Sequence, residues 1–590
     1  MPEKKMAGIQ AVNLPDQKEL EKEISDYLSR KYGERIKIIS GGVVPQAQDD
    51  MAQGKLAKKA DDFFMNFTMK PEELVDYLDE YVIQQDQAKA VLATKICTHF
   101  NRIRFLEEHE IENRRDIGRI KNNILLIGPT GVGKTYLIKL IARKIGVPFV
   151  KGDATKFSET GYVGGDVEDL VRDLVREADD DIDRAQYGII YVDEIDKIAR
   201  SQNRIGIDVS RSGVQRALLK PMEDTDVELK VPHDIISQME AVEEYKVTGK
   251  RGKKTINTKN ILFIMSGAFD GLDEIVRKRC QKQTMGFEGT LSSAKDSMNF
   301  LKKVMAEDLV VFGFESEFIG RLPIVAVLAS LTEEDFYQIL RSPNCPVVLA
   351  KKQDFRVYGI NLFFTDEAYR EIARQSIQEK TGARGLVSVV ERVLLPFEKK
   401  LPSTEITSLC VGVETVIDPE KEIAQLLGSI DALKRHEEQC KEVAVAERER
   451  LVQFISQSKT VALRNQGVTG TDKKLQLIAT ISQRENMEIT DACQIIVEFV
   501  QRIKSWETKI SAECDITVSF EEDTIDKILD QESLTIENID TMCRKLLTAL
   551  EYGLRLMTHK KHITDVRIPA HGVEKPEQFI NELVEKTFKG

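Results

Sequence analysis

The sequence predicts an α/β protein with a doubly wound parallel sheet, followed by a smaller α+β domain and a mainly helical C-terminal extension. Three apolar runs carry this prediction, at Ile124–Ile127, residues 189–192 and residues 260–265. Each is short, mainly apolar and flanked by polar or glycine residues, which is typical of a strand buried on both faces. Helical patterns separate the runs, and strands that alternate with helices form parallel sheets.

Composition limits the classes of function. The chain has 590 residues, a net charge of −12 and eight cysteines that are scattered singly. This length predicts roughly three to five domains. The acidic balance disfavours nucleic acid as a partner, and isolated cysteines favour a reducing compartment. No window approaches the length of a membrane-spanning helix, so we expect no membrane span and a cytoplasmic location.

The N-terminal part is expected to hold one helix and a linker. Residues 14–32 have apolar positions at helical spacing, and residues 41–54 are polar and rich in small residues. They fit either a solvated arm or a small recruitment element. A helical pattern follows at residues 70–104, interrupted by a turn that carries Val82 and Ile83. This apolar pair could pack on an adenine ring or simply join the core.

The phosphate-binding candidate follows the first strand, in NILLIGPTGVGKT. It fits the pattern G-x-x-x-x-G-K-[ST] and leads into a helix. Glycines allow backbone N–H groups to surround phosphate oxygens, and the helix N-terminus adds a positive dipole end. The lysine reaches the β/γ-phosphates, and the threonine hydroxyl can ligate Mg²⁺. The predicted binding residues are Gly128, Pro129, Thr130, Gly131, Val132, Gly133, Lys134, Thr135 and Tyr136.

A carboxylate pair, Asp193 and Glu194, ends the strand at residues 189–192. Ligands of open α/β sheets bind at the carboxyl ends of strands. Asp193 can therefore hold Mg²⁺ together with Thr135, and Glu194 can orient the attacking water. Ser266, at the end of the strand in residues 260–265, places a polar side chain at the same edge.

A glycine-rich loop, residues 152–166, follows a predicted strand at residues 147–150. It holds Tyr162 and Val163 between two glycines. An aromatic and an aliphatic residue in such a loop are costly to expose, although a surface turn with a partly buried tyrosine is the alternative.

In this order, these motifs resemble the AAA+ protein unfoldases of the ClpX and HslU type, over residues 70–417. In that family GPTGVGKT is the Walker A loop, ATKFSETGYVG the pore loop and GIIYVDEIDKIAR the Walker B strand. DVSRSGVQRALLK resembles the following helix. EFIGRLPIV carries Arg321 at the arginine-finger position, and TGARGL carries Arg384 at the sensor-2 position. The short segment between pore loop and Walker B strand makes ClpX the closer relative.

The resemblance implies an AAA+ P-loop NTPase whose cofactors are ATP and Mg²⁺. It implies a homohexameric ring in which Arg321 acts on the neighbouring subunit's nucleotide. Tyr162 and Val163 would grip polypeptide in the axial channel. The implied catalytic residues are Lys134, Asp193, Glu194, Arg321 and Arg384.

The sequence departs from that family in three places and keeps its form in a fourth. No cysteine precedes Cys97, so the zinc module common in ClpX chains is expected to be absent, and Gln84 replaces a usual glycine. Lys250, Arg251, Lys253 and Lys254 form a basic patch where ClpX has a different pore loop, and this patch could either line the channel entrance or simply be solvated. Met285, Gly286 and Phe287 keep the form of the loop that docks on a ClpP-like peptidase, or they tuck into the domain.

The resemblance divides the chain into a large ATPase domain at 61–325 and a small lid domain at 326–418, after an N-terminal segment at 1–60. Residues 419–515 form a helical insertion, read as an antiparallel pair that could be a coiled coil. Residues 516–590 resemble a degenerate second lid: FTDEAYREI recurs as FEEDTIDKI 156 positions later, which places Asp540 at the position of Arg384. Chance similarity between two amphipathic patterns is the alternative.

The leading hypothesis is therefore an ATP-dependent unfoldase or remodelling chaperone that threads polypeptide, with a ClpP-like peptidase as a candidate partner. The alternative is a nucleotide-gated scaffold that binds partners through the C-terminal extension without threading them. A DNA motor is disfavoured, because a DNA channel should be lined with Lys and Arg.

Overall fold

The computed structural model describes residues 36–39, 42–45, 67–108, 121–158, 165–200, 209–229, 255–283, 300–530, 534–561 and 564–589. The chain divides into two compact units, residues 1–68 with 100–118 and residues 69–99 with 119–590. Among the described helices, none is long and apolar enough to cross a membrane.

The first unit contains a short antiparallel hairpin, β1 (Ile36–Ile39) and β2 (Gly42–Pro45). The expected N-terminal helix at 14–32 lies outside the described residues. We expected a linker throughout residues 41–54, and this was wrong for its first residues, because Gly42–Pro45 form β2. Val43 and Val44 are β-branched and pair with the isoleucine-rich β1, which favours a strand over a polar linker.

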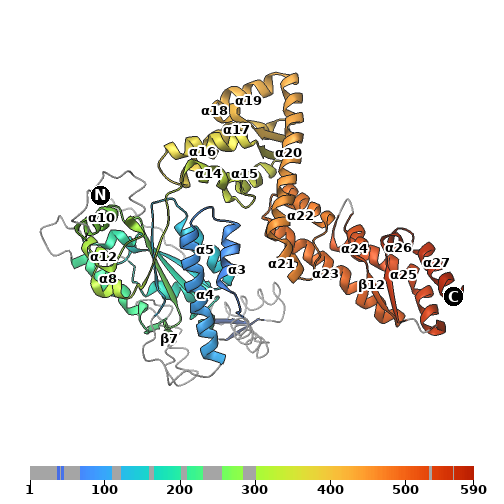
Figure 1. Ribbon diagram of the computed structural model, residues 1–590, viewed down its shortest axis with the longest axis horizontal. Helices are drawn as coiled ribbons and strands as arrows, with labels where there is room; N and C mark the ends of the chain where they lie inside the picture. The colour runs from blue at the N-terminus through green and yellow to red at the C-terminus, as the bar shows by residue number, and fades with distance from the viewer. Residues whose placement is uncertain are drawn as a thin grey trace, which may run out of the picture. The chain divides into compact units, whose positions relative to one another are not determined.

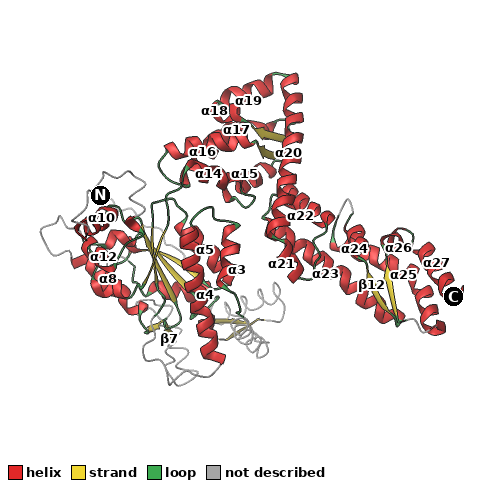
Figure 2. Ribbon diagram, viewed as in Figure 1, coloured by secondary structure: helices red, strands yellow, loops and turns green. Residues whose placement is uncertain are grey.

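The second unit contains a parallel sheet of five strands in the order β4-β5-β8-β3-β9, which confirms the predicted fold class. Figure 2 draws these strands, and Figure 1 shows α8, α10 and α12 on one side of them and α3 and α5 on the other. The strands are β3 (Ile124–Ile127), β4 (Phe149–Asp153), β5 (Ile189–Asp193), β8 (Leu262–Gly267) and β9 (Ile324–Val327).

Two strands of this sheet differ from the expectation. The strand placed at 147–150 begins instead at Phe149. Pro148, which lacks an N–H group, precedes it and only accepts a hydrogen bond from Ile189. β9 was not anticipated as a strand. It lies just after the Arg321 motif and runs to Val327, two residues past the expected domain boundary.

Helices and short strands cover the sheet and build a core of aliphatic and aromatic side chains around β5 and β8. The remaining elements of this part are α3 (Pro71–Asp79), α4 (Asp86–Glu108), α5 (Lys134–Ile145), η1 (Ala154–Lys156), α6 (Asp169–Glu177), α7 (Ile182–Ala185), η2 (Ile195–Ile198), α8 (Val209–Met222), β6 (Asp226–Glu228), β7 (Thr255–Asn257), α10 (Leu272–Gln283), α12 (Ala306–Phe312) and α13 (Ser316–Gly320).

A smaller α+β part follows with its own core, built around a parallel strand pair. One of its helices, α15 (Pro346–Arg356), contacts β10 (Asn361–Phe364). The elements are α14 (Glu333–Arg341), α15 (Pro346–Arg356), β10 (Asn361–Phe364), α16 (Asp366–Gln378), α17 (Arg384–Lys400), η3 (Leu401–Ser403), β11 (Ser408–Val411), α18 (Val413–Ile417) and α19 (Pro419–Gly428).

The helical insertion has more breaks than the expected antiparallel pair. The first expected helix is interrupted at Ser429, whose side chain caps the start of a new helix, α20 (Ile430–Ser458). A short helix, α21 (Thr460–Asn465), follows it. The second stretch breaks between α22 (Asp472–Glu485) and α23 (Ile489–Cys514). Asn486 ends α22 in the left-handed region at φ 49°, which asparagine tolerates better than most residues.

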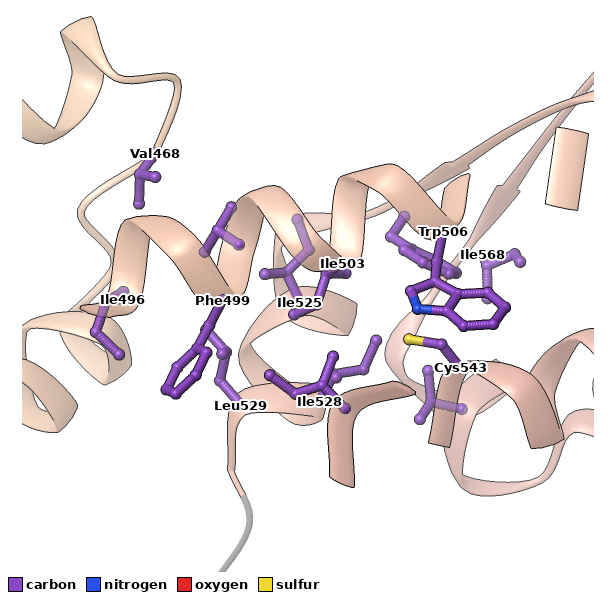
Figure 3. Close-up of a cluster of buried hydrophobic side chains, with 14 of the residues drawn as sticks. Val468, Ile496, Phe499, Ile503, Trp506, Ile525, Ile528, Leu529, Cys543 and Ile568 are labelled. Atoms are coloured by element: carbon purple, nitrogen blue, oxygen red, sulfur yellow. The ribbon is translucent and has the colours of Figure 1, made fainter. Parts of the chain in front are cut away.

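The C-terminal part contains a second parallel strand pair, β12 (Thr517–Phe520) with β13 (Asp565–Ile568). The helices are α24 (Glu522–Leu529), α25 (Ile536–Lys561), α26 (Ala570–Glu574) and α27 (Pro576–Lys589). Figure 3 shows α23 packing on α24 and α25 through Ile503, Ile528 and Cys543, with Trp506 at one end. One continuous core therefore joins α22 and α23 to the C-terminal elements.

Candidate nucleotide site

The glycine-rich loop between β3 and α5 has the backbone that its sequence predicts. Gly131 and Gly133 lie in the left-handed region, at φ 80° and 90°. A Cβ atom on Gly131 would stand 2.2 Å from the carbonyl oxygen of Thr381, in the lid. The Ala383 N–H also donates to the Gly131 carbonyl oxygen at 2.8 Å. The lid therefore touches the loop so closely that only glycine fits there.

Lys134 begins α5 and is buried. Its ammonium donates to the carbonyl oxygens of Gly128 at 2.6 Å and Pro129 at 3.0 Å. Burial lowers the pKa of Lys134, while Asp193 and Asp196 oppose that shift. The ammonium is thus held within the loop, where it can exchange carbonyl partners for phosphate oxygens.

Asp193 ends β5 and collects three side-chain partners. The Thr135 hydroxyl donates to Asp193 Oδ2 at 3.2 Å, and the Ser266 hydroxyl donates to Oδ1 at 2.6 Å. Lys151 Nζ lies 3.2 Å from Oδ2. Burial would raise the pKa of Asp193, but hydrogen bonds from Ser266, the Glu194 backbone and Lys151 outweigh it and lower the pKa. The carboxylate is therefore charged at neutral pH.

A buried tyrosine links these groups. The Tyr191 hydroxyl lies 2.6 Å from Ser266 Oγ and 3.2 Å from Thr135 Oγ1. Burial raises the pKa of Tyr191 to about 12. Sequence reasoning missed this residue, although a signal exists. Tyr191 and Asp193 are two positions apart in β5, and such residues face the same side of a sheet.

Glu194 lies just past the end of β5 with an unusual backbone, at φ 57° and ψ 32°. Non-glycine residues seldom adopt this conformation, and such strain gathers at functional sites. Its N–H donates to Asp193 Oδ1 at 3.1 Å. Asp196, which sequence reasoning also missed, is buried, accepts from the Ala268 N–H at 3.3 Å and pairs with Lys197 at 3.2 Å.

Lys134, Asp193, Glu194 and Asp196 are among the residues that surround a cavity of about 350 Å³. Elements from the large domain and the lid contribute to its walls, and Arg384 reaches it from the start of α17. The sequence-predicted residues in the lining are Thr130, Gly131, Gly133, Lys134, Thr135, Tyr136, Asp193, Glu194 and Arg384.

Five predicted binding residues stand apart from this lining. Gly128 and Pro129 contribute carbonyl oxygens to Lys134 instead. Val132 is buried, and Val82 and Ile83 are half-buried on the turn between α3 and α4.

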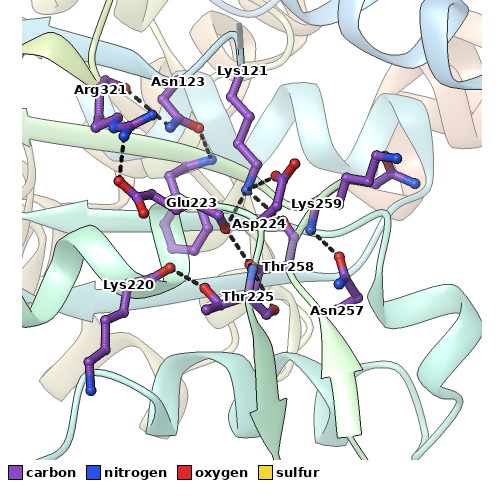
Figure 4. A network of polar contacts seen from close by, with 12 residues as sticks. Lys121, Asn123, Lys220, Glu223, Asp224, Thr225, Asn257, Thr258, Lys259 and Arg321 are labelled. Carbon is purple, nitrogen blue, oxygen red and sulfur yellow. Dashed lines mark hydrogen bonds and ion pairs between the residues drawn. The ribbon is translucent and has the colours of Figure 1, made fainter. Parts of the chain in front are cut away.

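Arg321 also lies outside the cavity lining. It follows α13, its side chain is 49% exposed, and its guanidinium pairs with Glu223 at 2.5 Å (Figure 4). Its carbonyl oxygen accepts from Asn123, whose own carbonyl oxygen accepts from the Phe263 N–H at 3.2 Å. The backbone at Arg321 is thus tied to β8, while its head group stands half in solvent.

Two predicted loops lie outside the described residues. They carry Tyr162 and Val163, and Met285, Gly286 and Phe287, and the basic segment at 250–254 lies outside as well. The base of the first loop is described: Phe157 and Gly165 form a β-bridge, and the Gly165 N–H donates to the Lys156 carbonyl oxygen at 3.0 Å.

In the described part of the chain, no three His, Cys, Asp or Glu side chains are grouped to hold a metal ion. The hydroxyl of Thr135 and the carboxylate of Asp193 are hard oxygen donors that lie together beside the cavity. This donor set fits Mg²⁺, which keeps few protein ligands and completes its shell with phosphates and water.

Comparisons with known proteins agree with this geometry. A family model for the AAA domain (Cdc48 subfamily) matches residues 119–325, and one for the C-terminal D2-small domain of ClpB protein matches residues 331–401. The ATP-dependent Clp protease ATP-binding subunit ClpX of Treponema denticola is 42% identical over 344 residues, which are 56% of this chain and 77% of the relative. ClpX 3 of Methylococcus capsulatus, with the same subunit name, is 39% identical over 363 residues, 59% of this chain and 80% of the relative.

The matched segments contain the glycine-rich loop, the Asp193–Glu194 pair and the lid arginine that meet at the cavity. The shared nucleotide machinery makes the protein an ATPase. The chain therefore belongs to the ClpX-like family of AAA+ ATPases.

Proposed function

We propose that the protein is an ATP-dependent unfoldase that draws polypeptide through the pore of a homohexameric ring. One observation carries most of this proposal: Lys134, Glu194 and Arg384 come from separate elements of two domains and line one cavity. Such an arrangement can couple hydrolysis to movement of the lid, because both domains contact the nucleotide.

Each residue has a proposed role. Lys134 and the loop N–H groups bind the β/γ-phosphates, Thr135 and Asp193 hold Mg²⁺, and Glu194 orients the attacking water. Bound Mg²⁺ would neutralise phosphate charge during transfer. Arg384 contacts the nucleotide from the lid, while Val82 and Ile83 are proposed to border the adenine.

Arg321 is proposed to complete the site of a neighbouring subunit. Charge that develops on the γ-phosphate needs a further cation, and Arg321 lies outside its own chain's cavity lining. Two facts support this role: the guanidinium is half exposed, and among the described residues its ion-pair partner is Glu223 alone. A ring follows from this proposal, because each site then requires a neighbour.

Threading and peptidase delivery are the further steps of the proposal. Tyr162 and Val163 would grip extended polypeptide by apolar contact, which is indifferent to sequence. Met285, Gly286 and Phe287 would dock on a ClpP-like peptidase; the names of the two relatives, as Clp protease subunits, support this partner. We place the protein in the cytoplasm with no nucleic-acid or membrane partner, which the eight free cysteines and the acidic charge support.

The test compares partners captured in cells by Glu194→Gln and by Glu194→Gln with Tyr162→Ala. Loss of the water-orienting carboxylate should leave ATP bound and the ring closed on its client. We expect clients only when Tyr162 is present, and a peptidase among them establishes delivery. Recovery of the same partners without Tyr162 would overturn threading and favour the nucleotide-gated scaffold, for which the long C-terminal extension provides the binding surface.

A further inference from the structure

The connector between α22 and α23, defined as residues 485–490 so that it includes the adjoining helix ends, contacts both domains that enclose the nucleotide cavity. On the lid side, Glu485 pairs with Arg356 at 2.5 Å. Asn486 accepts from the Gln353 side chain at 2.9 Å through its carbonyl oxygen, and its amide donates to the Lys352 carbonyl oxygen at 3.3 Å. The connector is therefore fixed on α15 by one ion pair and two hydrogen bonds.

On the other side, Glu488 of the same connector reaches the large domain. Its Oε1 atom accepts from Arg143 Nη1 at 3.1 Å, and its Oε2 atom accepts from the Tyr81 hydroxyl at 3.3 Å. Tyr81 also lies 3.1 Å from Thr490 Oγ1. One carboxylate thus joins α5, which begins at the phosphate loop, to the turn that precedes α4.

A second contact reinforces the first. Lys459, at the end of α20, pairs with Glu80 at 2.5 Å and donates to Thr490 Oγ1 at 3.1 Å. Both members of this pair are largely buried, with side chains 9% and 14% exposed. Glu80 and Tyr81 directly precede Val82 and Ile83, so the extension holds the turn at its base.

The surroundings of Glu488 connect it to the cavity wall. Tyr136, which lines the cavity, has its pKa raised first by burial and then by the charge of Glu488. Tyr77, whose ring centroid lies 5.0 Å from that of Tyr81, also has its pKa raised by burial and by this charge, with Arg143 opposing. Glu488 thus contacts Tyr81 directly, and its charge acts on Tyr77 and on Tyr136 at the cavity wall.

We propose that Glu488 is a positioning residue for ATP. By binding Tyr81 and Arg143, it holds α5 and the turn that carries Val82 and Ile83 in a fixed position relative to the lid. This inference rests on the proposed function of the cavity as the ATP site. It gives the C-terminal extension a part in nucleotide binding within its own chain, although none of the extension residues that the structure describes lines the cavity.

The test is the steady-state ATPase of the full chain carrying Glu488→Ala. We expect the KM for ATP to rise about fivefold with kcat within about twofold, because couplings carried through packed neighbours typically change affinity by factors of this size. Glu488→Gln should fall between, since it still accepts from Tyr81 but loses the charge that pairs with Arg143. The dissociation constant of ADP, measured by calorimetry, should follow KM.

Glu498→Ala is the matched control, because Glu498 is an exposed glutamate on α23, the helix that follows Glu488, and its side chain accepts only from Gln494, at 3.4 Å, among the described residues. It should leave KM and the melting temperature unchanged. Arg143→Ala should raise KM to a similar extent, and the double variant Arg143→Ala with Glu488→Ala should add little, because both remove one interaction.

The outcomes separate this inference from the function on which it rests. If the unaltered protein neither binds nor hydrolyses ATP, the proposed function fails. If it does, and Glu488→Ala keeps KM within twofold, the positioning role is wrong. A lower melting temperature with reduced kcat and unchanged KM likewise overturns it in favour of a purely structural contact. If the alanine variant does not fold, Glu488→Gln decides by the same criteria.

A different observation supports a second inference, on the C-terminal part. The elements α22-α23-β12-α24-α25-β13-α26-α27 repeat the order of α14-α15-β10-α16-α17-β11-α18-α19. Both strand pairs are parallel, and matching backbone hydrogen bonds flank them. These bonds run from the Asn361 N–H to Thr407 and the Thr517 N–H to Thr564, both 2.9 Å, and from the Thr365 N–H to Val411 and the Glu521 N–H to Ile568, both 3.1 Å.

The structure points to a duplicated lid that has lost nucleotide contact. Asp540 occupies the position of Arg384 in the aligned sequences, and its carboxylate is engaged inside the C-terminal part. It accepts from Arg502 at 2.7 and 2.6 Å and from the Trp506 indole at 2.8 Å. The charge of Asp540 is negative and is engaged by partners on α23. This copy therefore keeps the fold of the lid but lacks, at this position, a cation that could bind phosphate.

ADP titration of the full chain tests this inference. We expect at most one ADP per chain, an affinity at least tenfold weaker in Arg384→Ala, and no change in Asp540→Ala. A second nucleotide, or weaker ADP binding in Asp540→Ala, would overturn the loss of contact. An experimental structure in which β12 and β13 are antiparallel or apart would overturn the duplication itself.

Discussion

Lys151 Nζ lies 3.2 Å from Oδ2 of Asp193, the same oxygen that accepts the Thr135 hydroxyl. An ammonium therefore stands beside the two oxygen donors proposed for Mg²⁺. The Lys151 ammonium and a bound Mg²⁺ would repel each other at such distances. Because the side chain of Asp193 is only 19% exposed, solvent screens this repulsion only in part. The arrangement predicts that Lys151 weakens metal binding at this carboxylate.

Replacement of this lysine tests the competition. In Lys151→Gln, the Mg²⁺ concentration that gives half-maximal ATPase activity should fall roughly threefold, because the repelling charge is gone. Titration of activity with Mg²⁺ at fixed ATP measures it. Lys156→Gln, at an exposed lysine on η1, serves as the control. A higher Mg²⁺ requirement would mean that Lys151 supports the site instead.

Arg321→Ala should abolish ATP hydrolysis and leave ADP affinity unchanged, because this residue lies outside its own chain's cavity lining. A mixture of Arg321→Ala and Glu194→Gln chains should be more active than either variant alone. In a mixed ring, an intact Glu194 can face an intact Arg321 from its neighbour. ATPase assays over a range of mixing ratios measure this, and a mixture as inactive as its components argues for action within one chain.

Two neighbouring glutamines make a matched pair for backbone strain. Gln84 and Gln85 both adopt positive φ, at 62° and 67°. Gln84 is exposed, so Gln84→Gly removes strain of about 1–2 kcal/mol at the expense of about 0.5–1 kcal/mol of chain entropy. We expect a free energy of unfolding that is unchanged or up to about 1.5 kcal/mol higher.

Gln85→Gly should have the opposite sign, because the Gln85 side chain bonds both backbone groups of Ala329, at 2.8 Å and 2.7 Å. Loss of both bonds should cost about 1–3 kcal/mol, which outweighs the smaller net gain from relieved strain at φ 67°. Urea unfolding of both variants measures the difference. If Gln84→Gly is the more destabilising of the two, strain at this turn is not what the φ values indicate.

Asp540 predicts a pH dependence of stability in the C-terminal part. The hydrogen bonds from Arg502 and Trp506 outweigh burial and lower the pKa of Asp540 to about 2. A folded pKa below the unfolded value of about 3.9 means that the stabilisation is complete above that value and is lost as pH falls toward about 2. Asp540→Asn should therefore cost about 1 kcal/mol at pH 7, after allowance for solvent screening.

The comparison of urea unfolding at pH 7, 5 and 3 measures this window. The difference between Asp540→Asn and the unaltered chain should be constant from pH 7 to 5 and shrink by pH 3. Asp530→Asn, at an exposed carboxylate that forms no ion pair with the described residues, should show no such change. A difference that grows on acidification would contradict the sign of the shift.

The nucleotide loop shows how far local sequence reasoning reached. Gly128, Lys134 and Thr135 belong to one contiguous motif between a strand and a helix, and the structure has that strand and helix. Asp193 and Glu194 follow a buried strand, and parallel strands end at the same sheet edge, so their meeting with the loop was predictable. Asp196 and Tyr191 were missed, because their roles depend on hydrogen bonds to Ser266 and Ala268 across β8.

By itself, the sequence determined the parallel α/β fold, the loop and carboxylates that meet at its strand ends, and the family. Periodicity and contiguous motifs encode these features locally. Only the tertiary structure decided that Thr381 packs against Gly131, that β9 joins the sheet, and that Glu488 reaches Tyr81 and Arg143. Glu488 follows Tyr81 by 407 positions. No local pattern marks such a pair, because packing of whole helices brings the two together.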